Sequence, residues 1–396
     1  MTPLLNGRTL IGLRNLTIAT MVCLFSPTSL ALDVQVGLAG KVETVVAPEQ
    51  FNCSKPRARD LADIPASAYR TSDGEVILFA GNRTGFVFRG PTLDLVARKD
   101  CSSVNPSDGN PDPSEYRDQE WTTAFFSFNG RDVAAYVHNE YHGEMHGEDC
   151  HIVLTRNREC WYASSTLMHS SDGGKTFKVG DPEDSVIMGP SYRYKTGMRR
   201  VGTYMPKVVG GRDGKSVFVF VSRVDINRNL RIGQCLLRSD KNQRQWALWA
   251  DGKFRPAPRS PYTSDGADGK FEHCSPVMMG NVLSIKFMPS IDAYIAVGAN
   301  RKTGVYVQLS KDLVKWGPRH KISGIDLDSA TASTLKRGEY VHRRWYFSLL
   351  DPTSTSRNFD TIGKRPYLYF VEFGDGQRRQ KSIRTIKRVP LAISPF

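Results

Sequence analysis

The sequence predicts an all-β protein: a five-bladed β-propeller whose blades are four-stranded antiparallel sheets. Three observations predict this fold. Pairs of strand-like segments recur along the chain. In each of the first three pairs a tight-turn dipeptide joins the two segments, and no long helical pattern interrupts the series. Short β units that recur in this way pack stably when they are arranged radially around an axis. A β-sandwich with coincidental turns is the alternative fold.

The first 31 residues have the pattern of a secretory signal. Arg8 and Arg14 are present without any acidic residue, an apolar run follows at 16–25, and Ser29-Leu30-Ala31 offers a small-x-small cleavage site. A transmembrane anchor is the alternative interpretation, but the apolar run is too short to span a bilayer. We therefore expect export to the periplasm or the extracellular space.

The rest of the chain divides into two predicted parts. Residues 32–59 form a lead-in with enough valines for one strand, and residues 60–396 form a single propeller domain. Asp-Gly and Asn-Gly turns join the first three hairpins, because the two central positions of such a turn must accept positive φ. The predicted strand pairs are Ile64–Thr71 with Glu75–Ala80, Trp121–Phe128 with Asp132–His138, Pro206–Gly210 with Ser216–Ser222, Val282–Met288 with Ala293–Val297, and Trp345–Leu350 with Tyr367–Phe373.

Cysteine usage agrees with an exported protein. Seven cysteines are present, and removal of Cys23 with the signal leaves six, an even number that suits disulfide bonds. Sequence alone does not choose among the pairings, although Cys150 and Cys160 bracket a short segment and form the first pair to test. Zinc binding is the alternative, and the chain has no C-x-x-C spacing to favour it.

The chain is strongly basic. Its formal net charge is +14, and loss of the signal with its two arginines leaves +12. Such a charge favours anionic partners, among them acidic polysaccharides, or simply a solvated surface. Nucleic acid is not expected as a partner of an exported protein without a nucleic-acid-binding motif. We expect a monomer without a membrane span that binds a carbohydrate, with anionic carbohydrates among the candidates.

Propeller geometry nominates a site without any catalytic motif. Residues that precede the first strands gather with residues that follow the second strands around the mouth of the axial channel. Asparagine and arginine side chains that face one funnel suit hydroxyl-rich or anionic ligands. The residues in these places are Asp63, Glu120, Trp121, Tyr204 and Asn281 before first strands, and Asn82, Arg83, the run 138–142, Arg223, Asp225, Asn300 and Arg301 after second strands.

Two stretches resemble sialidases. Ser170 to Phe177 is similar to the Asp-box of sialidases and related propellers, which lies on an outer turn, so this resemblance implies a structural role for Asp172. Asp63-Ile64-Pro65 with Asp73-Gly74 also resembles a first sialidase blade. In that family an arginine that grips the sialic-acid carboxylate precedes the Ile-Pro. Asp63 stands there in this chain, which argues against sialidase activity.

The blade layout of residues 60–373 resembles the five-bladed glycosidases of glycoside hydrolase families 43 and 32. An acidic residue opens the first blade, and Ser310 to Trp316 has their S-x-D-L-x-x-W turn. The resemblance implies three carboxylates at first-strand openings: a base or nucleophile, a pKa modulator and a general acid. Asp63 matches the first place and Glu120 the second, whereas Tyr204-Met205-Pro206 opens the third blade without a glutamate.

Glycoside cleavage requires two carboxyl groups across the scissile bond, one that donates a proton and one that activates water or attacks the sugar. We predict Asp63 as the base, Glu120 as the modulator and Glu140 as the acid, with a raised pKa from its neutral and aromatic neighbours. Glu272 is a reserve acid. The predicted substrate-binding residues are Trp121, His138, Asn139, Tyr141, His142, Arg83, Arg223, Asn300 and Arg301. Neither a metal nor a cofactor is expected.

Two other functions remain open at this point. In a lyase acting on an anionic polysaccharide, Tyr141 or His142 would remove a proton beside a uronate carboxylate. In a non-catalytic carbohydrate-binding propeller, the same funnel would bind glycans without releasing products. The leading prediction is a secreted glycoside hydrolase.

Overall fold

The computed structural model describes residues 33–53, 62–83, 86–101, 108–151, 158–257, 259–262, 274–300, 302–327, 344–373 and 384–395. The predicted signal lies outside these residues. Residues 32–396 form one compact unit. Within the described ranges, no helix is long and apolar enough to cross a membrane.

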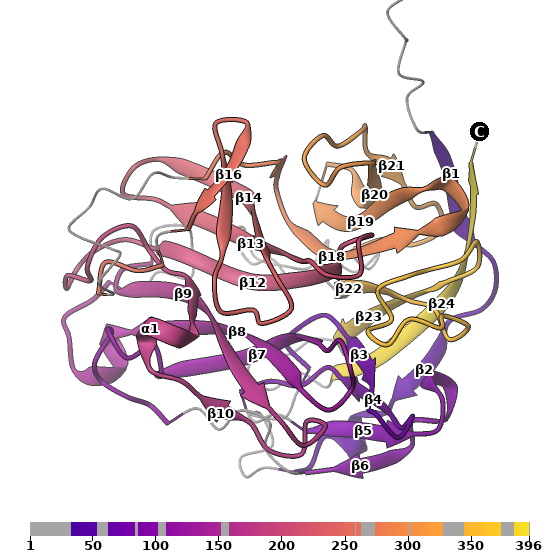
Figure 1. Ribbon diagram of the computed structural model, residues 1–396, viewed down its shortest axis with the longest axis horizontal. Coiled ribbons are helices and arrows are strands. Elements are labelled where there is room, and N and C mark those ends of the chain that lie inside the picture. The colour runs from indigo at the N-terminus through magenta and orange to yellow at the C-terminus, as the bar shows by residue number, and fades with distance from the viewer. Residues whose placement is uncertain are drawn as a thin grey trace, which may run out of the picture. The chain divides into compact units, whose positions relative to one another are not determined.

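The protein is all-β, as predicted, and its strands form four sheets (Figure 1). Two sheets have four strands in chain order. They are β3 (Ser67–Arg70), β4 (Val76–Phe79), β5 (Val87–Gly90) and β6 (Arg98–Asp100), and then β18 (Val282–Met288), β19 (Ala293–Asn300), β20 (Gly304–Ser310) and β21 (His320–Lys321).

The largest sheet has eleven strands and contains two antiparallel runs. β7, β8, β9 and β10 form one run, β12 to β16 form the other, and a short parallel pairing between β9 and β12 joins them. The strands are β7 (Gln119–Phe126), β8 (Val133–His142), β9 (Trp161–Ser170), β10 (Lys178–Val179), β11 (Val186–Met188), β12 (Val201–Gly210), β13 (Val217–Asp225), β14 (Leu230–Ser239), β15 (Ala247–Ala250), β16 (Lys253–Pro256) and β17 (Met278–Met279).

The last sheet joins the two ends of the described chain. Its order is β1-β24-β23-β22, with β2 also paired to β24, so the lead-in supplies two strands where one was expected. Terminal strands that pair in this way tie the two ends of the fold together. The strands are β1 (Val34–Leu38), β2 (Glu43–Val46), β22 (Arg344–Leu350), β23 (Tyr367–Phe373) and β24 (Arg384–Pro395).

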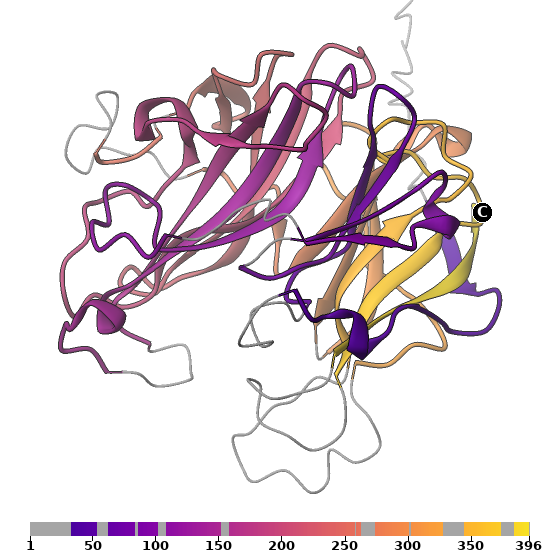
Figure 2. The same cartoon turned by 90° about the horizontal axis from the view of Figure 1, so that it is seen from below.

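The first strands of the successive runs contact one another in a closed cycle. β3 contacts β7, β7 contacts β12, β12 contacts β18, β18 contacts β22, and β22 contacts β3. In Figure 1 the labels of these five strands lie toward the middle of the molecule, and Figure 2 shows the same ribbon turned by 90°. This cycle brings together side chains from distant parts of the sequence.

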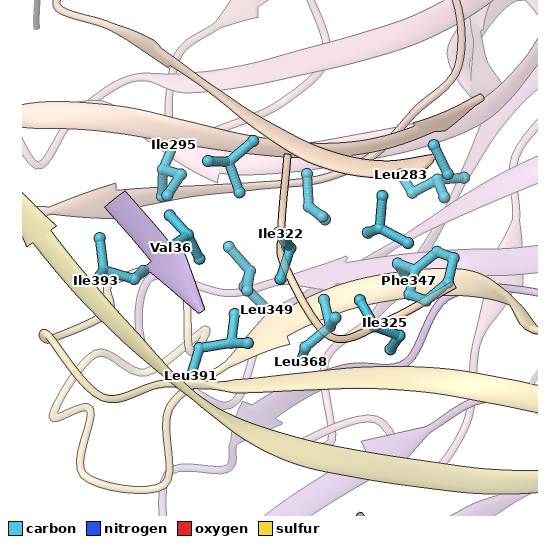
Figure 3. Packing of buried hydrophobic residues seen from close by; sticks show 14 of the residues in the cluster. Val36, Leu283, Ile295, Ile322, Ile325, Phe347, Leu349, Leu368, Leu391 and Ile393 are labelled. Carbon is cyan, nitrogen blue, oxygen red and sulfur yellow. The ribbon is translucent and has the colours of Figure 1, made fainter. Parts of the chain in front are cut away.

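Apolar side chains fill the spaces between neighbouring sheets. One cluster packs the β18–β21 sheet against the last sheet, and Val36 of β1 lies within it beside Ile295 and Ile393 (Figure 3). Burial of such side chains is the main favourable term in folding. The inner strands are thus fixed by cores on both of their sides.

Observed strands match the predicted pairs closely, and two differences concern the site. β18 and β23 have the predicted bounds, whereas β8 extends four residues further, to His142, and β12 begins at Val201. In the predicted turns only the glycines have positive φ: Gly74, Gly130 and Gly214. The expectation that both central residues adopt positive φ is therefore wrong.

All six predicted cysteines form disulfide bonds, which confirms that expectation. The pairs are Cys53–Cys101, Cys150–Cys160 and Cys235–Cys274, and the second is the pair that the sequence favoured. In the turn that resembles an Asp-box, the Asp172 carboxylate accepts the Thr176 hydroxyl at 2.6 Å. Asp172 also accepts the backbone N–H groups of Lys175 and Thr176, so its contacts are those of a turn.

Candidate functional site

The register of β7, β8 and β9 places the side chains of the run 138–142 on two different faces of one sheet. Successive residues of a strand point to opposite faces, and directly paired residues share a face. Glu140 pairs with Gln119 and Ala163, whereas Asn139 pairs with Glu120 and Ser164. The run 138–142 therefore supplies two different environments rather than the single one expected.

Glu140 occupies the first face, between two histidines of its own strand. Its Oε2 lies 2.7 Å from Nε2 of His142, and its Oε1 lies 3.2 Å from Nε2 of His138. Burial alone would raise the pKa of Glu140, but the charges and hydrogen bonds of the two histidines outweigh burial and hold it well below its usual range. The expectation of a raised pKa at Glu140 is therefore wrong.

The proton of this cluster belongs to His142. Burial lowers its pKa, yet the hydrogen bonds that its ring donates to Glu140 and Glu144 overcome that effect and raise the pKa to about 9. Glu144 lies 3.3 Å from Nδ1 of His142 and also binds Arg158, which helps to lower the pKa of Glu144 to about 2. At neutral pH the pair is therefore a Glu140 carboxylate beside a His142 imidazolium.

Aromatic rings surround this pair. The ring of His138 lies 5.5 Å from Trp121, 5.8 Å from Tyr204 and 6.3 Å from Trp161, measured between centroids. The guanidinium of Arg200 lies over Trp161 at 4.1 Å and over Tyr204 at 5.1 Å. Strands β7, β9 and β12 thus bring aromatic walls to the carboxylate on β8, and Arg200, directly before β12, brings a cation.

Asn139 and Tyr141 lie on the opposite face, in a network of tyrosines. Tyr141 donates to Oε1 of Glu148 at 2.9 Å, and Tyr194 donates to Oε2 of Glu148 at 2.6 Å. Asn139 donates to the backbone oxygen of Tyr116. Because these side chains are engaged within the fold, the structure does not bring them to the Glu140 cluster.

Glu120 also lies on this second face and is 1% exposed. Burial raises its pKa to about 8, against an opposing effect of Arg117. Glu120 therefore holds a proton at neutral pH, whereas Glu140 does not. The structure separates these two predicted catalytic carboxyls by placing them on opposite faces of one sheet.

Asp63 precedes β3, where the sequence placed it, and contacts the last sheet. Its Oδ1 accepts the Tyr346 hydroxyl at 2.7 Å and lies 2.8 Å from the guanidinium of Arg384. The backbone N–H of Asp63 donates to the carbonyl of Gly81. Asn82, which follows Gly81, accepts the indole N–H of Trp121 at 2.9 Å. Trp121 thus lies between the segment that holds Asp63 and the cluster around Glu140.

The remaining predicted residues fall in other places. Arg83 is half-buried and follows Asn82, to whose Oδ1 its backbone donates. Arg223 pairs with Thr203 and so faces away from Tyr204, into a pocket shared with Asp225. Asn300 accepts the backbone N–H of Thr303 in a turn. Arg301 and the reserve acid Glu272 lie outside the described residues.

Four members of the cluster were not predicted as site residues: Glu144, Arg158, Trp161 and Arg200. Trp161 pairs with His142 across β8 and β9. The backbone N–H of Arg200 donates to the carbonyl of Arg158. This hydrogen bond holds the residue before β12 next to the β8–β9 connection. Their proximity to Glu140 depends on sheet register, and no strand was predicted next to Arg158, Trp161 or Arg200.

One group of described residues has the spacing of metal ligands: Glu148, Cys150 and Cys160. Both sulfurs belong to the disulfide Cys150–Cys160, so no thiolate is available there. Glu148 already accepts hydroxyl groups from Tyr141 and Tyr194. This group is therefore a structural tie, not a metal centre.

No family model matches the chain, and no curated protein matches it. Similar solved structures include an α-L-arabinofuranosidase from Podospora anserina in complex with cellotriose, 11% identical, with 90% of this chain and 96% of that chain covered at a TM-score of 0.46. A GH43_1 enzyme from Xanthomonas citri is 11% identical, with 88% and 91% covered at 0.47. An α-L-arabinanase from Cellvibrio cellulosa in complex with arabinohexaose is 13% identical, with 84% and 92% covered at 0.41.

These names agree with the family resemblance noted in the sequence. The identities are at most 13% and the TM-scores are below 0.5. The functional assignment therefore depends on the geometry around Glu140.

Proposed function

We propose that this protein is a secreted glycoside hydrolase whose reaction takes place beside Glu140. One observation carries the proposal: the Glu140 carboxyl group lies 2.7 Å from Nε2 of His142, and aromatic side chains surround the pair. Sugar-binding sites need flat apolar surfaces together with a few well-placed polar groups. This cluster offers both.

In the proposed reaction, Asp63 activates water or attacks the sugar, and the Glu140–His142 pair protonates the leaving oxygen. Protonation must come from a group that holds a proton at working pH, and His142, not Glu140, meets that requirement. Glu140 orients the imidazole and stabilises its charge. Both residues therefore remain at the proposed site, but the proton donor is His142 instead of Glu140.

Asp63 is retained as the second carboxyl because Trp121 connects its surroundings to Glu140. The indole donates to Asn82 on one side and packs on His138 on the other. A sugar lying on Trp121 would have a carboxyl group on each side, the arrangement that glycoside cleavage requires. Glu120, which holds its proton on the opposite face, is assigned a structural role.

The proposed architecture is a propeller of five four-stranded blades. The closed cycle of contacts among β3, β7, β12, β18 and β22 supports five blades, and the β1–β24 pairing supports a last blade completed from the N-terminus. Three disulfides and the signal-like first 31 residues support export. In this architecture the ends of inner strands share one funnel.

The substrate is proposed to be an anionic carbohydrate. The Arg200 guanidinium is held flat by Trp161 and Tyr204, and among the described residues no carboxylate forms an ion pair with it. Its Nε atom is buried without a hydrogen-bond partner among them. A planar guanidinium in this state suits a carboxylate or sulfate group on a sugar.

The test uses the purified mature protein and a panel of neutral, uronate-containing and sulfated polysaccharides, assayed for released reducing ends. Asp63→Asn and Glu140→Gln are expected to lower product release by about 10²–10⁴-fold without a change in fold by circular dichroism. Glu115→Gln, an exposed residue on the segment before β7, is the matched control and is expected to retain full activity.

Full activity in both site variants would overturn the assignment. Glycan binding without any product would favour a carbohydrate-binding propeller. A lyase is the second candidate because the cationic groups of His142 and Arg200 lie on the same face as Glu140 and could neutralise a uronate. Absorbance from an unsaturated uronate, in place of simple hydrolysis products, would identify that reaction.

A further inference from the structure

The inner strands enclose a cavity that the proposed reaction does not use. All five of them line it, together with Asn358 from the β22–β23 connection. Its lining is rich in groups that can donate hydrogen bonds. These are Ser67 of β3, Thr123 of β7, Lys207 of β12, Ser284 and Lys286 of β18, and Ser348 of β22.

Lys286 brings a buried cation to this cavity. It is 8% exposed, and burial lowers its pKa to about 8, so it is mostly charged at pH 7. Asp360 is the carboxylate whose charge acts on it, but Asp360 is engaged elsewhere: Oδ2 accepts the backbone N–H of Gly210 at 2.8 Å, and Oδ1 accepts the hydroxyl of Ser356. Among the described residues no carboxylate forms an ion pair with Lys286.

Lys207 also lines the cavity, but its amine is directed to the outer strands β13 and β14. It is 5% exposed, and its Nζ donates to Oγ of Ser222 at 2.8 Å and to Oε1 of Gln234 at 2.9 Å. Both acceptors are neutral, and burial lowers the pKa of Lys207 to about 7. Lys286, to which no carboxylate is ion-paired among the described residues, therefore gives the cavity a positive potential, which repels metal cations and attracts anions.

Two hydroxyl groups of the lining have no hydrogen-bond partner within the described part of the chain. Ser348 is 1% exposed, and its Oγ and that of Ser67 are both buried and unpartnered there. Buried polar groups are normally hydrogen-bonded, so such hydroxyls indicate a bound species that accepts their protons. The buried ammonium of Lys286 requires the same species to be negative.

We propose that this cavity binds a small inorganic anion of the halide class, held by Lys286 and the Ser348 hydroxyl. Such an anion supplies the missing counter-charge and accepts hydrogen bonds from several directions. It lies among the five inner strands and stabilises their packing. The proposal is independent of the proposed glycosidase activity.

The test is thermal unfolding of the mature protein at pH 7, with chloride replacing gluconate at constant ionic strength. A specific site gives a saturable rise in Tm of about 2 °C at tenfold excess over the dissociation constant. Lys286→Met is expected to abolish the chloride dependence. Lys253→Met is the matched control, because Lys253 is exposed on β16, and it is expected to keep the dependence.

Crystals grown with bromide give a second, independent readout. An anomalous peak in the cavity beside Nζ of Lys286 and Oγ of Ser348 supports the proposal, and Ser348→Ala is expected to weaken the peak. If Lys286→Met does not fold, the wild-type bromide peak and Ser348→Ala decide the question. Only water in the cavity, together with a Tm that does not respond to chloride, overturns it.

Discussion

The two faces of β8 use similar residues for different purposes. On one face, Glu140 contacts two histidines, and the pKa of one of them, His142, is raised to about 9. On the other, Glu148 accepts the hydroxyls of Tyr141 and Tyr194, whose pKa values are raised well above the physiological range. Both glutamates are ionised, but only the first has a partner that can exchange a proton at working pH.

This difference shows what kind of carboxylate a functional site requires. Burial tends to raise the pKa of both glutamates, and hydrogen bonds lower it in both. The imidazolium of His142 leaves the Glu140 face reactive, whereas hydroxyl partners make the Glu148 face a structural tie between the β8–β9 connection and the segment that leads to β12. The predictions below separate these roles.

The largest expected effect is on catalysis. Glu140→Gln removes the charge that holds the His142 proton, so turnover should fall by about 10²–10⁴-fold. Glu148→Gln, the equivalent change beside the other face, should leave turnover within about threefold. Steady-state kinetics on the two variants measure the contrast. Equal losses in both variants would contradict the division between the faces.

Glu120 should make stability depend on pH from within the second face. The pKa of Glu120 is about 8 in the folded protein and 4.5 in the reference state, so protonated Glu120 stabilises the fold. This contribution to the free energy of unfolding is fully present below pH 4.5 and is lost as pH rises through 8. The loss is on the order of 4 kcal/mol. Glu120→Gln should remove this decline, which denaturant unfolding at pH 5 and pH 9 would reveal. A decline of the same size in Glu120→Gln would assign it to other groups.

His142 should set the alkaline limit of activity on the first face. Its pKa of about 9 implies that kcat falls about tenfold per pH unit above that value, as the imidazolium loses its proton. The charge of Arg158 lowers the pKa of His142, whereas Glu140 and Glu144 raise it. Glu144→Gln should therefore move the alkaline limit of activity to lower pH. Profiles of kcat against pH for wild type and Glu144→Gln test this. An unchanged limit would remove His142 from the assigned role.

The smallest effect is expected at the tyrosine network. Tyr194→Phe deletes one hydrogen bond to Glu148 and should lower the free energy of unfolding by about 1–2 kcal/mol. Activity should remain unchanged, because no proton transfer depends on this hydroxyl. Urea unfolding and the standard assay measure both quantities together, and a loss of activity without a loss of stability would place Tyr194 in the site.

Much of the fold could be predicted because its signals are local. Runs of β-branched, aromatic and other apolar residues specified β18 and β23 to the residue, although no Asp-Gly or Asn-Gly dipeptide joins either strand to its predicted partner, and cysteine parity anticipated three disulfides. β8 was predicted to end at His138, before Asn139 and Glu140, which have weak strand propensity. Pairing with β9 extends the strand there, because neighbouring-strand hydrogen bonds outweigh local preference.

The sequence by itself determined that acidic, aromatic and basic side chains would lie at strand ends, because strand order and chain direction follow from the hairpin repeats. Only the tertiary structure decided which of them meet. It placed Glu140 with Trp161, Tyr204 and Arg200, and placed Glu120 on the other face. The physical reason is that a pKa depends on burial and on neighbouring charges, and both depend on side chains that are distant in the sequence.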